Sequence, residues 1–542
     1  MAGDVRERSY DAVIVGAGFA GLYMLHRLRN LGLSARIYEA GTGVGGTWYW
    51  NRYPGARVDV ESLEYSYSFS PELDAEWKWS ERYATQPELL KYLNHVADRF
   101  DLRPDIQLET RVTAAHFDEA ANRWSVTTNR GETISARYCV MATGCLSVAN
   151  EIAFEGAESF QGRSFRTSSW PREGVDFTGE RVAVIGTGSS AIQTIPMIAE
   201  QASHVTVFQR TPNFSVPAHN GQIDPKIAAD WAAHRAQYRQ EARETGFGIR
   251  MVNPQDGLAL EADEATRRAA FEARWQVGGF ALLGAYADLI LDVNANATAA
   301  EFVREKIRSI VKDPATAEKL APKSFPIGAK RMCVDTGYYA TFNRDNVSLV
   351  DLQEEPLEAI APTGVRTSKA LYEVDAIIYA IGFDAMTGAL GKIDIRGRGG
   401  AALKEEWAAG PRTYLGLMIA GFPNLFIVTG PGSPSVLCNM AVAIEQHVEW
   451  ISDCIAWMGA RQMGAIEATR SAQDDWVAHV NEVAETTVYP LANSWYLGAN
   501  VPGKPRVFMP YIGGFPAYRD KCVEVAANGY EGCRVTSDAR VR

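Results

Sequence analysis

Near its start the chain has two short, mostly apolar runs that are typical of strands. Between them lies one stretch in which apolar residues recur with the period of a helix. The apolar runs are residues 13–15 and 35–38, and residues 22–28 between them have helical spacing. This pattern predicts a strand, a helix and a second strand. Gly16, Gly18 and Gly21 follow the first strand in G-x-G-x-x-G spacing, which in this context predicts a dinucleotide-binding turn.

An acidic residue stands at the end of the second predicted strand. Glu39 lies 23 residues after Gly16, near the distance at which a carboxylate accepts hydrogen bonds from ribose hydroxyls. The glycines let a pyrophosphate approach the backbone at a helix N-terminus, where free N–H groups favour an anion. The first unit therefore predicts a site for FAD, whose ribose 2′-hydroxyl is free.

The same order of strand, turn and helix returns at residue 181. Residues 182–185 are apolar, and Gly186, Gly188 and Ala191 give G-x-G-x-x-A, an accepted variant of the fingerprint. Two such units in one chain are more specific than one and predict two nucleotide sites.

The second unit differs from the first at the end of its next predicted strand, residues 205–208. Gln209 and Arg210 stand where the first unit has Glu39. An arginine pairs with a 2′-phosphate that an acid would repel, so this unit predicts an NADPH site. The alternative interpretation of Arg210 is a solvated charge at a strand end.

Several segments in the first half connect these units. Residues 41–61, rich in glycine and aromatic residues, are expected to form a lid over a ring system, with a surface Ω-loop as the alternative. Residues 86–100 have helical period, and residues 138–144 form a buried strand that ends at a glycine. Residues 160–171, FQGRSFRTSSWP, are expected to be a linker.

The second half contains fewer motifs. Residues 213–320 are helical and highly charged, and the favoured interpretation is a purely structural insertion. Residues 375–385 resemble the strand at 138–144, so the chain is expected to return there to the flavin sheet. Residues 425–439 are a third strand with a glycine-rich turn, and residues 498–504 are expected to be a mobile loop.

Composition limits the class of protein. The 542 residues predict two or three domains, and 46% apolar with 22% charged residues is typical of globular proteins. The net charge of −11 argues against nucleic-acid and anionic-membrane partners. Seven cysteines without a C-x-x-C, and no signal peptide, indicate a reduced, cytoplasmic protein. The scattered histidines offer no metal-ligand spacing.

The two fingerprints flank FQGRSFRTSSWP, with residues 45–62, GGTWYWNRYPGARVDVES, upstream and Lys330-Arg331 downstream. Together they resemble a type I Baeyer–Villiger monooxygenase, a class B flavoprotein that uses FAD, NADPH and O2. The resemblance covers almost the whole chain. Its C-terminal part, residues 430–440 and 493–510, is most similar to phenylacetone and steroid monooxygenases.

The chain departs from the family fingerprint F-x-G-x-x-x-H-x-x-x-W-P at one position. Phe160, Gly162, Trp170 and Pro171 match it, but Arg166 stands at the histidine position. The family's histidine is associated with a linker that moves as the NADP domain rotates. An arginine keeps a cation but has no neutral form at pH 7, so the departure concerns coupling and not the class of reaction.

The resemblance implies the conversion of ketones to esters or lactones through a C4a-peroxyflavin. It makes Arg331 the catalytic arginine, because a fixed guanidinium can hold the anionic peroxide and then the oxyanion of the adduct. Asp59 matches the acid that pairs with this arginine and orients it.

The resemblance also assigns residues around the cofactors and the ketone. Lys330 matches a residue near the 2′-phosphate, and Trp495 matches a tryptophan on the loop that closes over NADP. The fingerprints and the resemblance together place around the cofactors Gly16, Gly18, Gly21, Glu39, Thr47, Trp48, Asp59, Tyr65, Gly186, Thr187, Gly188, Ser189, Gln193, Arg210, Thr211, Lys330, Arg331 and Trp495. The substrate pocket is expected to include Cys145, Leu146, Leu437 and Met440.

Two other functions stay open. In an N- or S-oxygenating class B monooxygenase the flavin hydroperoxide stays protonated, whereas Asp59 and Arg331 suit an anion. A protein that binds FAD and NADP and senses redox state without oxygenating anything is the second alternative. A disulfide reductase is disfavoured by the missing C-x-x-C.

The predicted fold class is α/β, with two Rossmann-like dinucleotide-binding domains for FAD and NADP and a helical insertion. Residues 1–150 and 381–542 are expected to form the FAD domain, which includes the mobile C-terminal loop. Residues 151–212 and 325–380 are expected to form the NADP domain, with 213–324 as the insertion. The active site is expected at their junction, in a protein that acts as a monomer.

Overall fold

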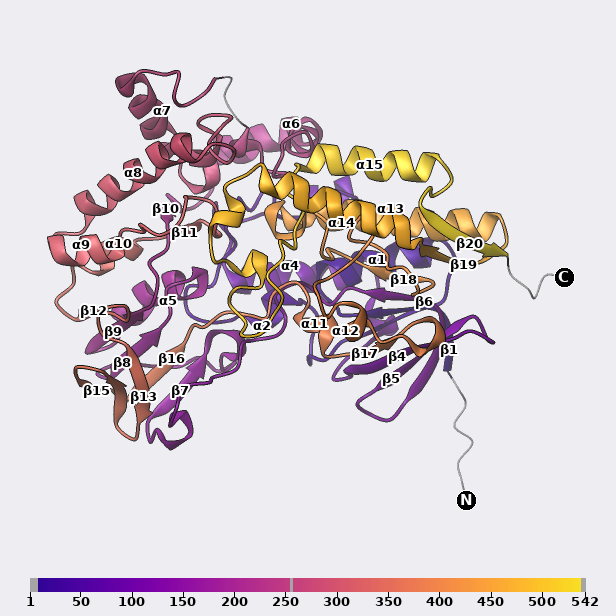
Figure 1. Ribbon diagram of the computed structural model, residues 1–542, viewed down its shortest axis with the longest axis horizontal. Helices are drawn as coiled ribbons and strands as arrows, with labels where there is room; N and C mark the ends of the chain where they lie inside the picture. Colours follow the sequence, from indigo (N-terminus) through magenta and orange to yellow (C-terminus); the bar gives the residue numbers. More distant parts are fainter. Residues whose placement is uncertain (1–7, 254–256, 538–542) are drawn as a thin grey trace.

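The computed structural model describes residues 8–253 and 257–537, and Figure 1 shows two sheets with helices packed around them. The first sheet has the order β17-β4-β5-β6-β1-β2-β3, and β18 pairs with β6. Pairing is parallel except for β4-β5 and β5-β6. Its strands are β1 (Arg8–Val15), β2 (Ala35–Tyr38), β3 (Ile106–Gln107), β4 (Val112–Asp118), β5 (Arg123–Thr128), β6 (Thr133–Met141), β17 (Asp394–Arg396) and β18 (Leu425–Ile427).

The start of the chain folds as predicted, because its pattern is local. Strand β1 leads through the glycine turn into α1 (Phe19–Asn30), and β1 pairs with β2 in parallel register. Gly21 allows the close packing of helix on turn, since a Cβ there would come within 1.8 Å of the Gly16 carbonyl oxygen. The predicted helix at 86–100 is confirmed as α4 (Gln86–Arg99).

The second sheet has five parallel strands in the order β12-β9-β8-β16-β7. Strand β8 leads into α5 (Ser189–Ala199) at the second fingerprint. A small antiparallel sheet, β13-β14-β15, lies beside it at the lower left of Figure 1. The strands are β7 (Arg163–Arg166), β8 (Arg181–Ile185), β9 (His204–Gln209), β12 (Val347–Asp351), β13 (Leu357–Ala361), β14 (Gly364–Thr367), β15 (Leu371–Glu373) and β16 (Ala376–Tyr379).

Two expectations about this sheet are wrong. The expected linker 160–171 contains β7, which pairs with β16 at the sheet edge. The strand at 375–385 is β16, which lies between β8 and β7 and not in the first sheet. Buried parallel strands all read as apolar runs, so the likeness of 375–385 to 138–144 carried no information about which sheet it joins. The chain re-enters the first sheet at β17.

The predicted helical stretch lies between β10 (Ser215–Pro217) and β11 (Cys333–Asp335), which pair with each other. Its helices are α6 (Pro225–Arg243), α7 (Glu264–Val277), α8 (Val293–Ile310) and α9 (Pro314–Leu320), with 3-10 turns at Arg250–Val252 and Gly279–Gly284. Aspartate side chains accept hydrogen bonds at the N-termini of all four helices, which explains where each begins.

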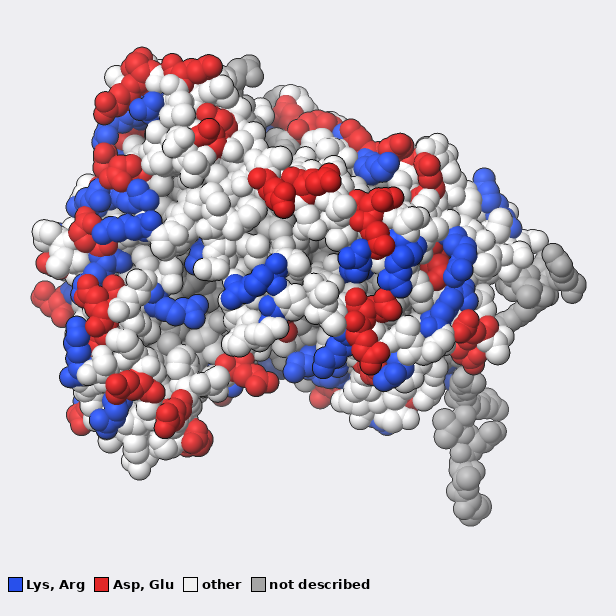
Figure 2. Space-filling view, in the orientation of Figure 1, with Lys and Arg blue, Asp and Glu red and all other residues white. Residues whose placement is uncertain are grey.

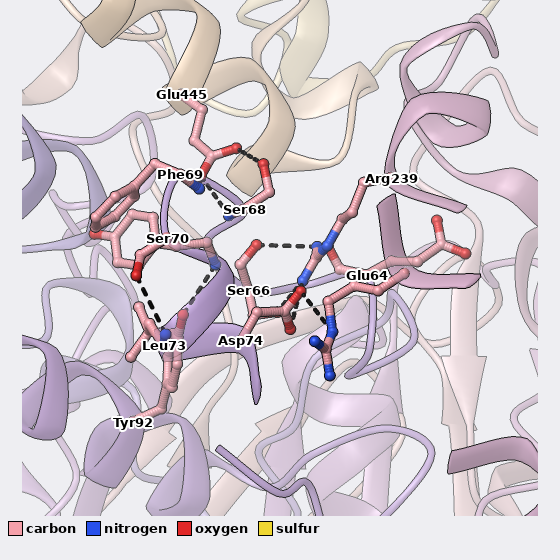
Figure 3. A network of polar contacts seen from close by, with 12 residues as sticks. Glu64, Ser66, Ser68, Phe69, Ser70, Leu73, Asp74, Tyr92, Arg239 and Glu445 are labelled. Atoms are coloured by element: carbon pink, nitrogen blue, oxygen red, sulfur yellow. Dashed lines mark hydrogen bonds and ion pairs between the residues drawn. The ribbon is translucent and has the colours of Figure 1, made fainter. Parts of the chain in front are cut away.

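Buried ion pairs attach α6 to the first domain, as Figure 3 shows. Arg239 and Arg235 both contact Asp74, at 3.3 Å each, and Arg239 also donates to the carbonyl oxygens of Glu64 and Ser66. The Asp74 and Arg239 side chains are only 10% and 11% exposed. Unpairing either charge would leave the other buried without compensation, so this contact holds the insertion against the segment at 64–74.

The C-terminal part packs on the first sheet's helices. Helix α13 (Met440–Ala460) packs against α1 and α15, and Figure 1 shows α13, α14 and α15 along the upper right. The remaining elements of this part are β19 (Met463–Ala468), α14 (Arg470–Glu485), α15 (Phe515–Ala527) and β20 (Cys533–Ser537). Among the described residues, no helix combines the length and apolar character needed to cross a membrane.

Candidate active site

The first glycine turn leaves a helix N-terminus open to an anion. Helix α1 begins after Gly18, no side chain caps it, and its first turn has no acidic residue. Gly18 faces Gly46 directly, and a Cβ on Gly46 would come within 2.8 Å of the Gly18 Cα atom. At Gly18 and Gly46 the turn thus presents backbone without side chains, as the approach of a pyrophosphate requires.

Glu39 lies where the sequence predicts, at the end of β2, and is 5% exposed. Its carboxylate accepts hydrogen bonds from the backbone N–H groups of Ala17 and Gly41, at 2.8 and 2.7 Å. These contacts fix an acidic group beside the turn, which fits a free ribose hydroxyl and disfavours a 2′-phosphate.

The glycine-rich loop at 41–61 packs against this turn. Gly45 donates its N–H to the Ala17 carbonyl oxygen at 2.9 Å, and Thr47 begins the short helix α2 (Thr47–Trp50). Trp48 contacts Tyr65 edge to face, with ring centroids 5.9 Å apart. Thr47, Trp48 and Tyr65, which were predicted to contact the cofactor, are thus brought beside the dinucleotide turn, and the group as a whole fits FAD.

The second turn repeats this arrangement. Helix α5 begins after Gly188 without a side-chain cap or an acidic residue in its first turn. The Thr187 hydroxyl donates to the Thr211 carbonyl oxygen at 2.8 Å, which joins the turn to the end of β9. Ser189 is the first helical residue, and its hydroxyl lies 3.3 Å from the Cys333 sulfur.

Two cations meet at the edge of this second turn. Arg210 is exposed at the end of β9, and Lys330 lies over the Phe325 ring with its Nζ 4.6 Å from the centroid. Burial lowers the pKa of Lys330, and the nearby charge of Arg210 lowers it further. In the described chain neither cation joins an ion pair. Paired cations without an acid fit the 2′-phosphate of NADP.

Basic side chains also gather on the surface of the molecule. Although the net charge is −11, Figure 2 shows Lys and Arg side chains gathered along the middle of this face, where it is hollowed between the left and right parts of the molecule. A basic hollow on an acidic protein raises the local concentration of an anionic coenzyme.

Arg331 and Asp59, 272 residues apart in sequence, lie in direct contact. The Arg331 Nε and Nη2 atoms both donate to Asp59 Oδ2, at 3.0 and 2.8 Å. The Nη1 atom donates to the Val436 carbonyl oxygen at 2.8 Å, and the guanidinium lies 4.6 Å from the Phe280 ring centroid. Burial alone would lower the pKa of Arg331, but the Asp59 carboxylate outweighs it and the pKa is raised.

Two tyrosines face the same guanidinium. Burial raises the pKa of Tyr496 to about 12, although the Arg331 charge opposes the shift, and burial also raises the pKa of Tyr489. Both hydroxyls are therefore neutral at pH 7, and the positive charge beside them is that of Arg331. The sequence analysis did not single out Tyr496, although it directly follows Trp495.

Arg331 borders a small apolar cavity with a volume of about 30 Å³. Leu437 is the one predicted pocket residue in its wall; Cys145, Leu146 and Met440 belong to an adjoining apolar cluster. The wall also takes side chains from the insertion, for which the sequence predicted a purely structural role. The insertion residues in the wall are Phe247, Ile249, Val252, Phe280 and Leu283.

Gln193 and Trp495 were both expected to face the coenzyme. Gln193 is buried in α5 and bonds across to the first domain, accepting from the Tyr53 hydroxyl at 2.9 Å and donating to the Arg57 carbonyl oxygen at 3.1 Å. Trp495 packs on Tyr496, with ring centroids 4.2 Å apart. These contacts make Gln193 a tie between the two dinucleotide units.

The C-terminal loop, expected to be mobile, is joined to the segment after β16. Lys504 contacts Asp384 at 2.5 Å and donates to the Ala385 carbonyl oxygen, and Asn500 donates to the Phe383 carbonyl oxygen at 2.6 Å. The Lys504 side chain is only 11% exposed. These contacts tie the loop to residues 383–385, shortly after Tyr496, which lines the cavity.

Arg166 ends β7 and pairs in register with Tyr379 of β16. It is half-buried, and its charge opposes the effect of burial on the pKa of the Tyr379 hydroxyl. The residue at the fingerprint histidine position thus lies at the edge of the second sheet, away from the Arg331 guanidinium.

The comparisons agree with this geometry. Residues 13–245 match the family model for pyridine nucleotide-disulphide oxidoreductase. A Baeyer-Villiger monooxygenase of Pseudooceanicola batsensis is 43% identical over 96% of this chain and 95% of its own. The phenazine N-monooxygenase PhzNO1 of Lysobacter antibioticus is 42% identical over 98% of this chain and 97% of its own.

Solved structures are also similar over nearly the whole chain. An oxidized steroid monooxygenase bound to NADP is 55% identical, with a TM-score of 0.94 over 98% of this chain and 100% of that one. OTEMO in complex with FAD and NADP is 40% identical, with a TM-score of 0.94 over the same shares of the two chains.

Proposed function

The chain belongs to the Baeyer–Villiger monooxygenase family of NADPH-dependent flavoproteins, and from this premise we propose that Arg331 and Asp59 catalyse the oxidation of ketones to esters or lactones. The observation that carries the proposal is the buried Arg331–Asp59 pair at the wall of an apolar cavity. The cavity lining of leucine, valine, isoleucine and aromatic side chains with one cation has the chemistry that an uncharged ketone requires.

FAD would be held by the first turn with Glu39, and NADPH by the second turn with Arg210, Thr211 and Lys330. Bound FAD would supply the redox chemistry, since it accepts hydride from NADPH and passes electrons to O2. Arg331 would hold the negative charge that develops on oxygen, with its guanidinium fixed by Asp59 and by the Val436 carbonyl oxygen. Its raised pKa keeps it cationic at neutral pH.

The domain limits expected from the sequence are part of this proposal: an FAD domain of residues 1–150 and 381–542, an NADP domain of residues 151–212 and 325–380, and the insertion between them. The proposal also includes a monomeric state, O2 as the second substrate and a cytoplasmic location. All seven cysteines are free, which supports a reduced compartment.

N-oxygenation is the second candidate, because PhzNO1 is about as similar as the Baeyer–Villiger relative. The two are separated by product. The purified protein is incubated with NADPH, O2 and panels of linear, cyclic, aryl and steroid ketones, tertiary amines and sulfides. Esters or lactones support the proposal, and N-oxides or sulfoxides with no ester from any ketone would replace it.

We expect the purified protein to be yellow with FAD, because Glu39 fits a ribose hydroxyl and the bare glycine turn fits a pyrophosphate. The cofactor is released by heat and identified by chromatography. Tightly bound FMN, or no flavin after reconstitution with FAD, would contradict the assignment of the first turn.

Arg166→His is expected to keep ketone oxidation, since Arg166 lies at the second sheet's edge and not at the cavity. The change should alter mainly the rate, or the fraction of NADPH lost to hydrogen peroxide. Ester yield and peroxide are measured per NADPH consumed. A folded, FAD-bound variant that makes no ester would show a role of Arg166 that its position does not explain.

A further inference from the structure

Glu64 lies where three segments meet, two of which line the cavity. It belongs to the segment of Asp59 and Tyr65, it is 4% exposed, and Figure 3 shows it beside Arg239. The second segment is residues 246–252 of the insertion, and the third is residues 437–440 at the start of α13. Nothing in the proposed mechanism uses this buried carboxyl group.

Hydrogen bonds close a ring through these segments. The Arg250 N–H donates to Glu64 Oε2 at 3.0 Å, and the Asn439 side chain donates to the Glu64 carbonyl oxygen at 2.9 Å. The Asn439 N–H in turn donates to the Phe247 carbonyl oxygen at 2.8 Å. One residue therefore fixes both the insertion wall and the α13 wall of the cavity.

The hydrogen bond from the Arg250 N–H is the main contact of the Glu64 carboxyl group. The Arg250 guanidinium bonds to Glu241 at 3.0 Å and stacks on the Tyr238 ring, so only the Arg250 backbone reaches Glu64. Burial raises the pKa of Glu64 to about 7, the Arg250 N–H opposes this, Glu61 raises it further, and the charges of Arg250 and Arg239 lower it. A costly buried acid that accepts one backbone N–H is consistent with a positional role.

The two walls pack closely together. Gly248 has φ +64°, and a Cβ there would come within 2.6 Å of the Cys438 sulfur. Phe247, Ile249 and Val252 on one side, and Leu437 and Cys438 on the other, contact the same cavity.

We propose that Glu64 is a positioning residue of the ketone pocket, which holds residues 246–252 against residues 437–440 through the Arg250 N–H. This inference rests on the proposed function. Glu64 does not touch Arg331 or the two glycine turns, so it acts on the binding of the ketone and not on the reduction of the flavin by NADPH.

The test compares Glu64→Met, which keeps the volume and removes the acceptor, with Glu64→Gln, which keeps an acceptor oxygen. Glu76→Met is the control, at a carboxylate that pairs with Arg99 instead. Loss of one buried hydrogen bond is expected to raise the KM for the ketone about tenfold in Glu64→Met. Glu64→Gln and Glu76→Met should stay near the wild-type KM, and all three should be reduced by NADPH at nearly the wild-type rate.

Amide hydrogen exchange gives a readout besides turnover, since residues 246–252 should exchange faster in Glu64→Met than in Glu64→Gln. If Glu64→Met does not retain FAD, Asn439→Ser opens the same ring while keeping a capping oxygen, and the same rise in KM is expected. An unchanged ketone KM, or an equal rise in Glu64→Gln, overturns the proposal. A wild-type protein that makes no ester from any ketone overturns the proposed function instead.

Discussion

Arg331→Ala is expected to be reduced by NADPH and to make no detectable ester. Reduction requires a nicotinamide held near the flavin, and the two turns, Arg210 and Lys330 supply that without Arg331. Oxygenation requires a cation where negative charge develops on oxygen. Removing one such donor typically costs about 10²–10³ in rate, and here the whole charge is lost, so the electrons should leave as hydrogen peroxide.

Neighbouring variants separate charge from geometry. Arg331→Lys should not restore ester formation, because its ammonium cannot bond to Asp59 through two nitrogens and to the Val436 carbonyl oxygen at once. Asp59→Ala should be milder, since it leaves the guanidinium in place with the Val436 contact alone.

The measurement is stopped-flow reduction under nitrogen, followed by mixing with O2 and a ketone, with ester determined by gas chromatography and peroxide by a coupled assay. Lys323→Ala, which removes a lysine that pairs with Glu318 and is not in the cavity wall, is the control for general effects of losing a cation. A normal ester yield from Arg331→Ala would remove this residue from the mechanism.

The two dinucleotide units were predictable because each is a local pattern. Short β-branched runs, turn glycines and the helix that follows lie within about 30 residues, so their spacing alone determines strand, turn and helix. Glu39 was found for the same reason, as its distance from Gly16 along the chain is fixed by the unit.

What depends on distant contacts was not predictable from pattern. The pairing of Arg331 with Asp59 across 272 residues came from family resemblance and not from spacing. The cavity wall built by Phe247, Ile249 and Val252 was missed, because the insertion's position depends on buried contacts such as Arg239 with Asp74. The sequence did contain a sign of this contact, because Arg235, Arg239 and Arg243 recur at helical spacing on one face of α6.

The second large effect concerns the choice of coenzyme. Arg210 and Lys330 are neighbouring cations at the second turn, and neither pairs with an acid in the described chain. Their mutual repulsion is relieved when a 2′-phosphate joins them, and NADH has none. The wild type is therefore expected to prefer NADPH strongly.

Arg210→Ala is expected to raise the KM for NADPH and to leave that for NADH nearly unchanged. Losing one charged contact costs on the order of 1–3 kcal/mol. In the double variant with Lys330→Ala, the preference for NADPH over NADH should therefore fall by a factor of roughly 10²–10³. Steady-state kinetics with both coenzymes and one ketone measures it, and Lys323→Ala, which removes a nearby lysine that pairs with Glu318, is the matched control. Equal losses for NADPH and NADH would show that the two cations hold the coenzyme elsewhere, and the second site would then no longer be assigned to the 2′-phosphate.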